Sequence, residues 1–244
     1  MLAISSHPTP RTAAPQAVRN RLLRLLPPAE LERLRLEPVE LPLKSLLLMP
    51  DTLVESLHFV ESGTVSMIAM LEDGTQIEVG LVGPEGVAGL PLLLGAGTSA
   101  LEGMVQVRGT ALRLPAAALR AALAEAPSLL GLLLRYVDAF HFQVAQSAAC
   151  NGRHHIEQRL ARWLLMTHDR VGEDSFFMTQ EFMSIMLGVR RPGVTLAIGA
   201  LQRAGLVRHE KSHVRMLDRS GLEAACCECY RLVQRRFDWL TAQP

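Results

Sequence analysis

The sequence predicts an α+β fold in which an antiparallel β domain is followed by a long helix and then by a compact helical domain that includes a β-hairpin. Three observations lead to this prediction. Short β-rich runs alternate with turn signals from Leu36 to Leu114, an apolar stripe repeats at helical spacing from Ser128 to Cys150, and two short helical patterns after position 178 precede two β runs. With 244 residues, 49% of them hydrophobic, the chain is long enough for two modest domains.

The N-terminal β domain is predicted from its alternation of β-rich runs and turn residues. The expected strands are Leu57–Val60, Thr64–Leu71, Thr75–Val82 and Gly103–Leu114, and the expected turns include Glu61-Ser62-Gly63 and Glu72-Asp73-Gly74. Asp-Gly and Ser-Gly at such breaks are typical of hairpins between antiparallel strands. The segment is therefore expected to form a small barrel or β-roll.

Two prolines introduce the helices that follow. Pro115 precedes an Ala- and Leu-rich helical pattern, and Pro127 opens a longer helix. The longer helix is expected to end at Cys150, because Asn151-Gly152 is a helix-breaking pair.

This longer helix carries apolar or small residues at alternating spacings of three and four, which is the pattern of a coiled-coil seam. The seam residues are Leu130, Leu133, Val137, Phe140, Val144 and Ser147. They predict a homodimer. The alternative, a core helix packed on its own β-roll, accounts for the additional Leu129, Leu132 and Leu134, so both faces of the helix are expected to be used.

Residues 179–203 carry the local signals of two short helices joined by a tight turn. Thr179 is expected to cap the first helix, Gly188 to supply the turn, and Pro192 to lie in the first turn of the second helix, where its missing N–H costs little. The expected buried faces are Phe182, Met183, Met186 and Leu187 on the first helix and Val194, Ala197, Ile198 and Leu201 on the second. Two β runs, Leu206–His209 and Val214–Leu217, predict a hairpin wing.

This arrangement predicts a winged helix-turn-helix that binds double-stranded DNA. In such a module the second helix enters the major groove, where arginine contacts guanine through two hydrogen bonds, while the wing contacts phosphate. The candidate DNA-binding residues are Thr179, Gln180, Arg190, Arg191, Thr195, Leu196, Gln202, Arg203, Lys211 and Ser212. Among them Arg191 is expected to read a base, and Lys211 at the wing tip to contact phosphate.

The distribution of charge agrees with this assignment. Residues 1–150 hold 11 Lys and Arg against 14 Asp and Glu, whereas residues 151–217 hold 10 against 6, although the whole chain has a formal net charge of only +1. No secretory signal and no membrane-spanning apolar stretch is evident in the sequence, so a cytoplasmic protein with no membrane partner is expected.

The sequence resembles the Crp/Fnr superfamily of bacterial transcription regulators from about Leu31 to Tyr230. The run TQEFMSIMLGVRRPGVTLAIGALQRAGLV resembles the DNA-binding signature of that family, and VESGTVSMIAMLEDGTQIEVGLVGPEGVAGLPLLLG resembles its cyclic-nucleotide-binding-like β-roll. The resemblance implies a homodimer that binds a pseudo-palindromic operator, with an effector that reorients the recognition helices. It also implies RNA polymerase as a partner if the protein is an activator.

The effector region departs from the family pattern. The candidate pocket residues are Gly86, Gly89, Leu90, Thr98 and Ser99. Members that bind cyclic AMP carry a glutamate and an Arg-Ser or Arg-Thr pair where this chain has Leu90 and Thr98-Ser99, so a charge-assisted contact to the phosphate is missing. Cyclic AMP is therefore not expected, and the effector is left open.

Cofactors are also constrained by the resemblance. Iron-sulfur members use cysteines near the N-terminus, whereas this chain has none before Cys150, so an iron-sulfur cluster is not expected. Haem is left open, with His58, His141, Met49 or an N-terminal group as candidate axial ligands.

The cysteines near the C-terminus raise the question of a metal site. Cys226, Cys227 and Cys229 lie within four residues, and a metal would be favoured if His154 or His155 lay nearby. On a continuous helix, however, neighbouring residues point to different sides, and the spacing is not the usual Cys-x2-Cys pair. Inert buried thiols and no metal are expected.

Two other classes of function were weighed against DNA binding. No phosphate loop, zinc-protease motif, nucleophile elbow or recognisable carboxylate pair supports an enzyme. A regulatory module that acts on protein partners is the main alternative, but it needs neither a wing nor a recognition helix.

The expected organisation is a disordered tail over residues 1–20, a β-roll with flanking helices over 21–127, a dimerisation helix over 128–150, a winged helix-turn-helix over 151–220 and a C-terminal helix over 221–244.

Overall fold

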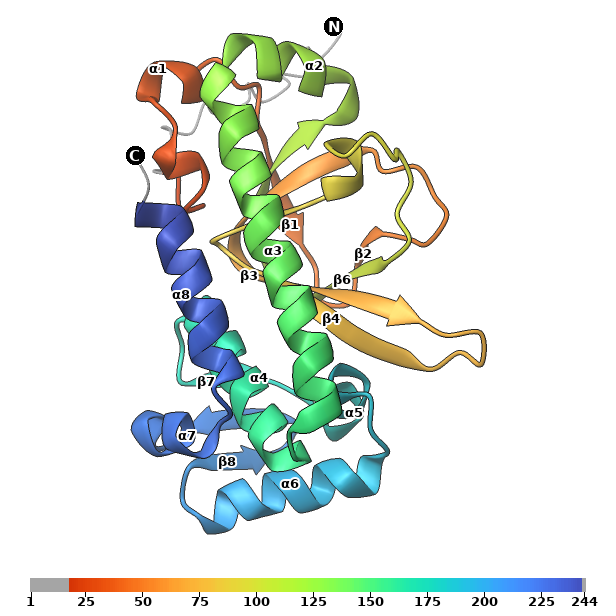
Figure 1. Cartoon of the computed structure of the whole chain (residues 1–244), viewed down its shortest axis with the longest axis vertical. Helices are drawn as coiled ribbons and strands as arrows, with labels where there is room; N and C mark the ends of the chain where they lie inside the picture. Colours follow the sequence, from red (N-terminus) through yellow and green to blue (C-terminus); the bar gives the residue numbers. More distant parts are fainter. Residues whose placement is uncertain (1–17, 243–244) are drawn as a thin grey trace, which may run out of the picture.

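The computed structural model describes residues 18–242 and has three parts (Figure 1). A β-roll lies to one side of the long helix α3 (Pro127–Arg153), which runs along most of the molecule. Helix α8 (Cys229–Ala242) lies beside α3, and a small helical domain with its own sheet occupies the end of the molecule opposite α2 (Ala116–Glu125). The predicted α+β fold is confirmed.

The β-roll is an antiparallel sheet of six strands. Its main path is β1-β6-β3-β4, with β2 paired to β6 and β5 paired to β3. The strands are β1 (Glu37–Leu41), β2 (Leu46–Leu48), β3 (Ser56–Met70), β4 (Gln76–Val82), β5 (Val87–Ala88) and β6 (Glu102–Pro115). Short helical turns, η1 (Leu23–Leu25), α1 (Pro28–Leu31) and η2 (Leu90–Leu92), complete the domain.

Strand β3 corrects one prediction. The Glu61-Ser62-Gly63 segment does not form a turn but lies within a single strand of 15 residues, where the register against β6 shifts on both sides of Ser62. Gly63 has φ of 78°, and an added Cβ would lie 2.4 Å from the carbonyl oxygen of Val107. Glycine is therefore needed for a β-bulge, which has the same local signal as a turn. The Glu72-Asp73-Gly74 hairpin between β3 and β4 forms as expected.

Helix α3 starts at Pro127 as predicted but continues past Asn151 and Gly152 to Arg153, so the predicted break is wrong. A glycine within a helix costs only about 1 kcal/mol relative to alanine, which packing of the rest of the helix offsets. The helix ends at His154, whose backbone is extended.

The C-terminal part contains helices and a three-stranded sheet in the order β7-β9-β8. Its elements are α4 (Ile156–Val171), β7 (Ser175–Phe177), α5 (Gln180–Leu187), α6 (Arg191–Arg203), β8 (Val207–Glu210), β9 (His213–Met216), α7 (Arg219–Ala225) and α8. Strand β7 was not predicted, because its three residues form a strand only by pairing with β9, which is distant in sequence. The expected single C-terminal helix is two helices with a corner between them.

The predicted N-terminal tail falls mainly on residues 1–17, which lie outside the described residues. Residues 18–20, which the prediction also assigned to the tail, are part of the fold. Asn20 is fully buried, and its side-chain amide donates to the carbonyl oxygens of Val60 and Gly86 at 2.8 Å. Its backbone N–H donates to the carboxylate of Glu61 at 2.9 Å. The β-roll therefore begins before residue 20.

The β-roll and the C-terminal domain share one apolar core. Ile68 of β3 and Leu81 of β4 are fully buried in the same cluster as Leu164 of α4 and Met183 of α5. The two domains also approach closely at the turn after α5, where a Cβ on Gly188 would lie 2.9 Å from the side chain of Ile77. The second domain is thus docked against the β3–β4 hairpin.

Two buried polar contacts cross the same boundary. The indole N–H of Trp163 on α4 donates to Glu78 Oε1 on β4 at 2.8 Å. Arg170, in the last turn of α4, pairs with Glu85 at 2.7 Å, and both side chains are only 8% exposed. Because a buried charge without its partner is costly, these pairs hold α4 in one position on the β-roll.

No single helix in residues 18–242 is long and apolar enough to cross a membrane. Helices α2 and α3 meet the length and composition criteria only when taken together, and they are bent by 115° at their junction.

We predict that Glu78 makes the stability of the protein depend on pH. Burial raises the pKa of Glu78 from 4.5 to about 7, against the opposing effects of Ser66, Trp163, Arg162 and Arg170. Below pH 4.5 the group is neutral in both the folded and unfolded states. Between pH 4.5 and about 7 the unfolded chain ionises Glu78 while the folded protein keeps it protonated, so stability falls as pH rises, by at most about 1.4 kcal/mol per pH unit, and levels off above pH 7.

The measurement is urea unfolding across this pH window. Glu78→Gln should flatten the decline, whereas Glu72→Gln, a change at an exposed carboxylate on the same hairpin, should follow the wild type. An identical decline in wild type and Glu78→Gln would contradict the assignment.

Candidate nucleic-acid interface

Helices α5 and α6 form the predicted helix-turn-helix. Thr179 Oγ1 accepts a hydrogen bond from the backbone N–H of Phe182 at 3.1 Å, which caps α5. Gly188 ends α5 with φ of 59°, in the left-handed region that glycine adopts at low cost. Pro192 lies in the first turn of α6. The local signals for the cap, the turn and the helix start are all confirmed.

Helix α6 has one buried and one open side. The predicted inward residues Val194, Ala197, Ile198 and Leu201 are all buried. On the other side Leu196 is 70% exposed, which is the second largest exposure among the large hydrophobic side chains of the described residues. A single exposed leucine is common on protein surfaces, but on the open side of a recognition helix its side chain is placed to contact a thymine methyl group.

Four candidate DNA-binding residues lie exposed at the ends of α6. Arg190 and Arg191 lie at its N-terminus, and Gln202 and Arg203 lie at its C-terminal end. Two cations at the positive end of a helix dipole are unfavourable in the free protein. A bound anion such as a DNA phosphate relieves that repulsion, because helix N-termini favour anions.

Thr195 and Gln202 already have hydrogen-bond partners within the domain. The Thr195 hydroxyl lies 3.0 Å from Gln180 Oε1 and 3.1 Å from the carbonyl oxygen of Arg191, so it can link α6 to α5. Gln202 Oε1 accepts from the backbone N–H of His209 at 2.7 Å. Gln202 therefore ties the recognition helix to the wing, and its NH2 group is the part left to face DNA.

The wing is the hairpin of β8 and β9, and Lys211 and Ser212 form its tip. Both tip residues have positive φ, 48° and 63°, as a two-residue hairpin turn requires. Sequence reasoning missed Arg208 and Arg215, which are directly paired across the two strands and both exposed. The alternation of apolar and polar residues along the two β runs could have assigned both arginines to the outer face of the wing.

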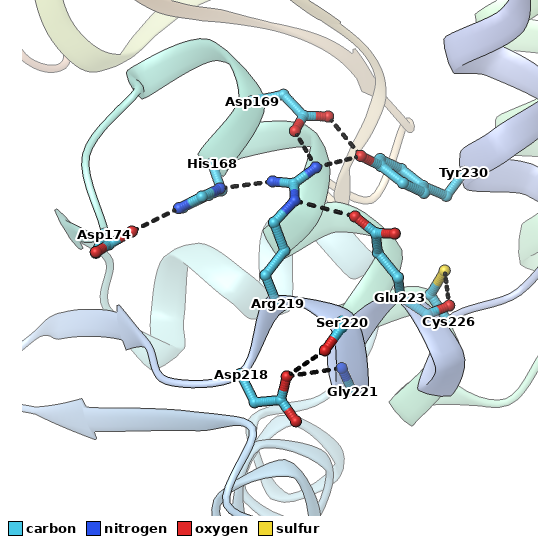
Figure 2. Close-up of polar contacts among 10 residues, drawn as sticks. All are labelled: His168, Asp169, Asp174, Asp218, Arg219, Ser220, Gly221, Glu223, Cys226 and Tyr230. Atoms are coloured by element: carbon cyan, nitrogen blue, oxygen red, sulfur yellow. Dashed lines mark hydrogen bonds and ion pairs between the residues drawn. The ribbon is translucent and has the colours of Figure 1, made fainter.

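The α7–α8 corner is held to α4 by a network around Arg219 (Figure 2). The Arg219 guanidinium donates to Asp169 at 2.7 Å, to the Tyr230 hydroxyl at 2.8 Å and to His168 Nδ1 at 2.7 Å. Because His168 Nδ1 accepts, its Nε2 carries the proton and donates to Asp174 at 3.1 Å. Tyr230 in turn donates to the other oxygen of Asp169 at 2.8 Å, so this cluster joins α4, α7 and α8.

The predicted dimer seam on α3 is divided between two faces. Leu133 is fully buried in the core of its own chain, and Ser147 accepts a hydrogen bond from Arg162 at 3.0 Å. Phe140 packs against Gly80 of β4. Leu130 is 41% exposed, and Val137 and Val144 are partly exposed. The spacing of apolar residues in the sequence indicated a stripe along α3, but it could not distinguish residues that face the core from residues that face solvent.

The candidate effector residues differ in exposure, since Gly86, Gly89 and Ser99 are buried, Leu90 is partly buried and Thr98 is exposed. Gly86 faces the ring of Tyr136 from α3, and Tyr136 is fully buried. The Ser99 hydroxyl donates to the carbonyl oxygen of Leu101 at 2.7 Å, within its own turn. Gly89 has φ of 105°, Leu90 begins η2 beside it, and Thr98 forms a bridge with Leu53.

The three haem-ligand candidates separate into two groups. Met49 and His58 line one cavity of the β-roll together with Arg113. Burial and the charge of Arg113 lower the pKa of His58 to about 4, so its imidazole is neutral at physiological pH. His141 lies exposed on α3.

An exposed recognition helix with a basic wing, attached to a β-roll through a long helix, defines a winged-helix DNA-binding protein. Residues 38–126 match the cyclic nucleotide-binding domain family, and residues 158–225 match the Crp-like helix-turn-helix domain family. The chain belongs to the Crp/Fnr family and is a DNA-binding transcription regulator. No curated protein matches it by sequence.

Solved structures of similar fold include FixK2 from Bradyrhizobium japonicum, with a TM-score of 0.68 and 17% identity over 80% of this chain and 98% of that one. A putative regulator of the Crp/Fnr family from Eubacterium rectale has a TM-score of 0.66 and 16% identity, covering 84% and 96% of the two chains. A CRP/FNR-family regulator from Thermus thermophilus has a TM-score of 0.63 and 21% identity, covering 78% and 97%. At these identities the likeness concerns the fold.

We predict that Arg219 stabilises the C-terminal domain. Arg219→Ala should lower the free energy of unfolding by about 1–3 kcal/mol, because it removes charge-assisted hydrogen bonds and leaves Asp169 without its cation. Chemical unfolding measures this change. Arg235→Ala, at an exposed arginine of α8, should have almost no effect, and equal stabilities of the two variants would contradict the role of the network.

Proposed function

We propose that the protein binds a pseudo-palindromic operator as a homodimer and places one α6 helix in the major groove of each half-site. The observation that carries this proposal is the open side of α6, where Leu196 is 70% exposed beside Arg190 and Arg191. Arginine at the start of a recognition helix suits contact with guanine O6 and N7, and an apolar side chain suits contact with a thymine methyl. The half-sites should lie about 34 Å apart, one turn of DNA.

We assign the remaining contacts by position. Thr179, Gln180 and Thr195 lie where α5 meets α6, so they suit the phosphate backbone or a base at the edge of the half-site. Lys211 and Ser212 at the wing tip suit phosphate contact, as does Arg203 at the far end of α6. Arg208 and Arg215 add positive charge along the wing.

The dimer contact is proposed for the face of α3 that its own chain leaves open. Leu130, Leu134, Val137, His141 and Ala145 follow one another at spacings of three or four and are all at least partly exposed. Such a stripe is wide enough for a second copy of the helix. Compared with the predicted seam, this stripe keeps Leu130 and Val137 and leaves Leu133 and Ser147 to the core.

The proposed function includes control by a small effector. This effector is not cyclic AMP, because no guanidinium is present at Thr98-Ser99 to bind a cyclic phosphate. The protein acts in the cytoplasm, contacts RNA polymerase if it is an activator, and has no catalytic activity of its own. A regulatory module acting only on protein partners would show no selective binding in a gel shift with pooled genomic duplexes.

We predict that Leu134→Glu converts the dimer to a monomer. Leu134 is 50% exposed, so the change removes apolar contact area and places like charges together at a two-fold interface without disturbing the core. Sedimentation measures the result. Leu94→Glu, at a leucine that is 60% exposed in a β-roll loop, is the matched control and should stay dimeric. An unchanged dimer in Leu134→Glu would show that α3 is not the contact.

We predict that Arg191→Ala and Lys211→Ala weaken DNA binding in different ways. Loss of a base contact should relax selectivity at one position of each half-site by about 1–3 kcal/mol. Loss of a phosphate contact should weaken all sequences equally and reduce the slope of log K against log salt by about 1 per protomer.

Binding-site selection across a salt series separates these outcomes. If Arg191→Ala lowers affinity uniformly with selectivity intact, then Arg191 contacts phosphate and base reading falls to Arg190, Thr195 or Leu196.

A further inference from the structure

Three cysteines and one histidine converge where α3 meets the α7–α8 corner. Cys150 and His154 lie one helical turn apart at the end of α3, and Cys227 and Cys229 lie at the corner between α7 and α8. Their four potential ligand atoms all lie within 4.8 Å of one another. Cys150 Sγ is 3.5 Å from Cys227 Sγ, and Cys229 Sγ is 3.5 Å from His154 Nδ1.

The two separations of 3.5 Å equal the edge of a tetrahedron around a single ion, and the other pairs, all within 4.8 Å, need to close by at most about 1 Å to reach it. Zinc binds thiolate at about 2.3 Å and imidazole nitrogen at about 2.0–2.1 Å, so tetrahedral ligands lie roughly 3.5–3.8 Å apart. In an iron-sulfur cluster the thiolates bind different iron atoms and are spread farther apart. We propose that Cys150, His154, Cys227 and Cys229 form a mononuclear Cys3His zinc site that fastens the end of α3 to the α7–α8 corner.

The surroundings of the four residues are those of a metal site. His154 directs Nδ1 at the cluster, and its Nε2 lies 3.3 Å from Glu228 Oε2. A carboxylate on the outer nitrogen is the usual partner of a zinc-bound histidine, because it fixes the tautomer and the ring orientation. The Gln146 side chain also donates to Cys229 Sγ at 3.1 Å, which suits a thiolate acceptor.

The charge of the site is balanced nearby. Zinc with three thiolates and a neutral histidine carries a net charge of −1, and the buried Arg162 and the half-buried Arg159 lie close by on α4. Both guanidinium groups therefore lie where they offset the negative charge of the zinc-bound site.

The ligand set indicates a structural role. All four positions of a tetrahedral ion are taken by protein, and the three cysteines are buried, so no position is left for a substrate. The site joins the dimer helix of one domain to the C-terminal segment of the other. The sequence does not reveal the site because Cys226 to Glu228 are not helical, and because Cys150 lies 77 positions before Cys227.

The test is the metal content of the full-length protein, which does not depend on operator binding. Protein without a histidine tag is dialysed with zinc and then against buffer, and its zinc is measured by mass spectrometry. Wild type should retain one zinc per chain, and Cys150→Ser and Cys227→Ser should retain little. The matched control is Cys226→Ser. Cys226 lies outside the cluster, with its sulfur directed at the Glu223 carbonyl oxygen at 3.3 Å (Figure 2), so this variant should retain a full zinc.

A second variant tests the site even if the cysteine variants fail to fold. The Glu228 side chain is 70% exposed, so Glu228→Gln should fold normally and bind zinc about 10-fold more weakly. Cobalt provides an independent readout, since tetrahedral thiolate ligation gives a charge-transfer band and strong visible bands that Cys227→Ser should lack.

Three results would overturn the proposal. They are zinc-free wild type after dialysis with the metal, equal zinc in Cys226→Ser and Cys227→Ser, and a Cys150–Cys227 disulfide in protein alkylated at cell lysis.

Discussion

The packing of α4 between the β-roll and the helix-turn-helix is the constraint on which the rest of the structure depends. Apolar residues of β3 and β4 are buried in the same cluster as those of α4 and α5, and the Trp163–Glu78 and Arg170–Glu85 contacts fix the register of that packing. The position of α6 follows, since α6 packs on α4 and α5. The position of α6 relative to the β3–β4 hairpin is therefore set by packing rather than by a flexible linker.

A second connection runs along α3. This helix packs on the β-roll through Tyr136, carries α8 along its side, and ends beside Cys227 and Cys229. The α7–α8 corner is thus held from two directions, by the Arg219 network to α4 and by the cysteine cluster to α3. If two copies pair along the open face of α3, both connections fix the position of each recognition helix relative to the dimer axis.

Local signals in the sequence were sufficient for much of this structure. The Thr179 cap, the Gly188 turn and the Pro192 helix start depend on neighbouring residues only, and all three formed as expected. The predictions that were wrong or missing depend on contacts between residues that are far apart in the sequence. Gly63 signals a bulge or a turn equally well until β6 pairs beside it, β7 forms only against β9, and Leu133 could be assigned to the core only once the β-roll was in place. The convergence of Cys150 with Cys227 spans 77 positions and has no local signature.

The shared core is the central claim, and amide hydrogen exchange in the intact, DNA-free protein tests it most directly. In mild denaturant, amides of β4 (Gln76–Val82) and of the buried part of α4 should exchange with the same opening free energy, because the two elements belong to one cooperative unit. If α4 and α5 instead open at a much lower free energy while β4 stays protected, the domains are separable and the account of how α6 is positioned is contradicted.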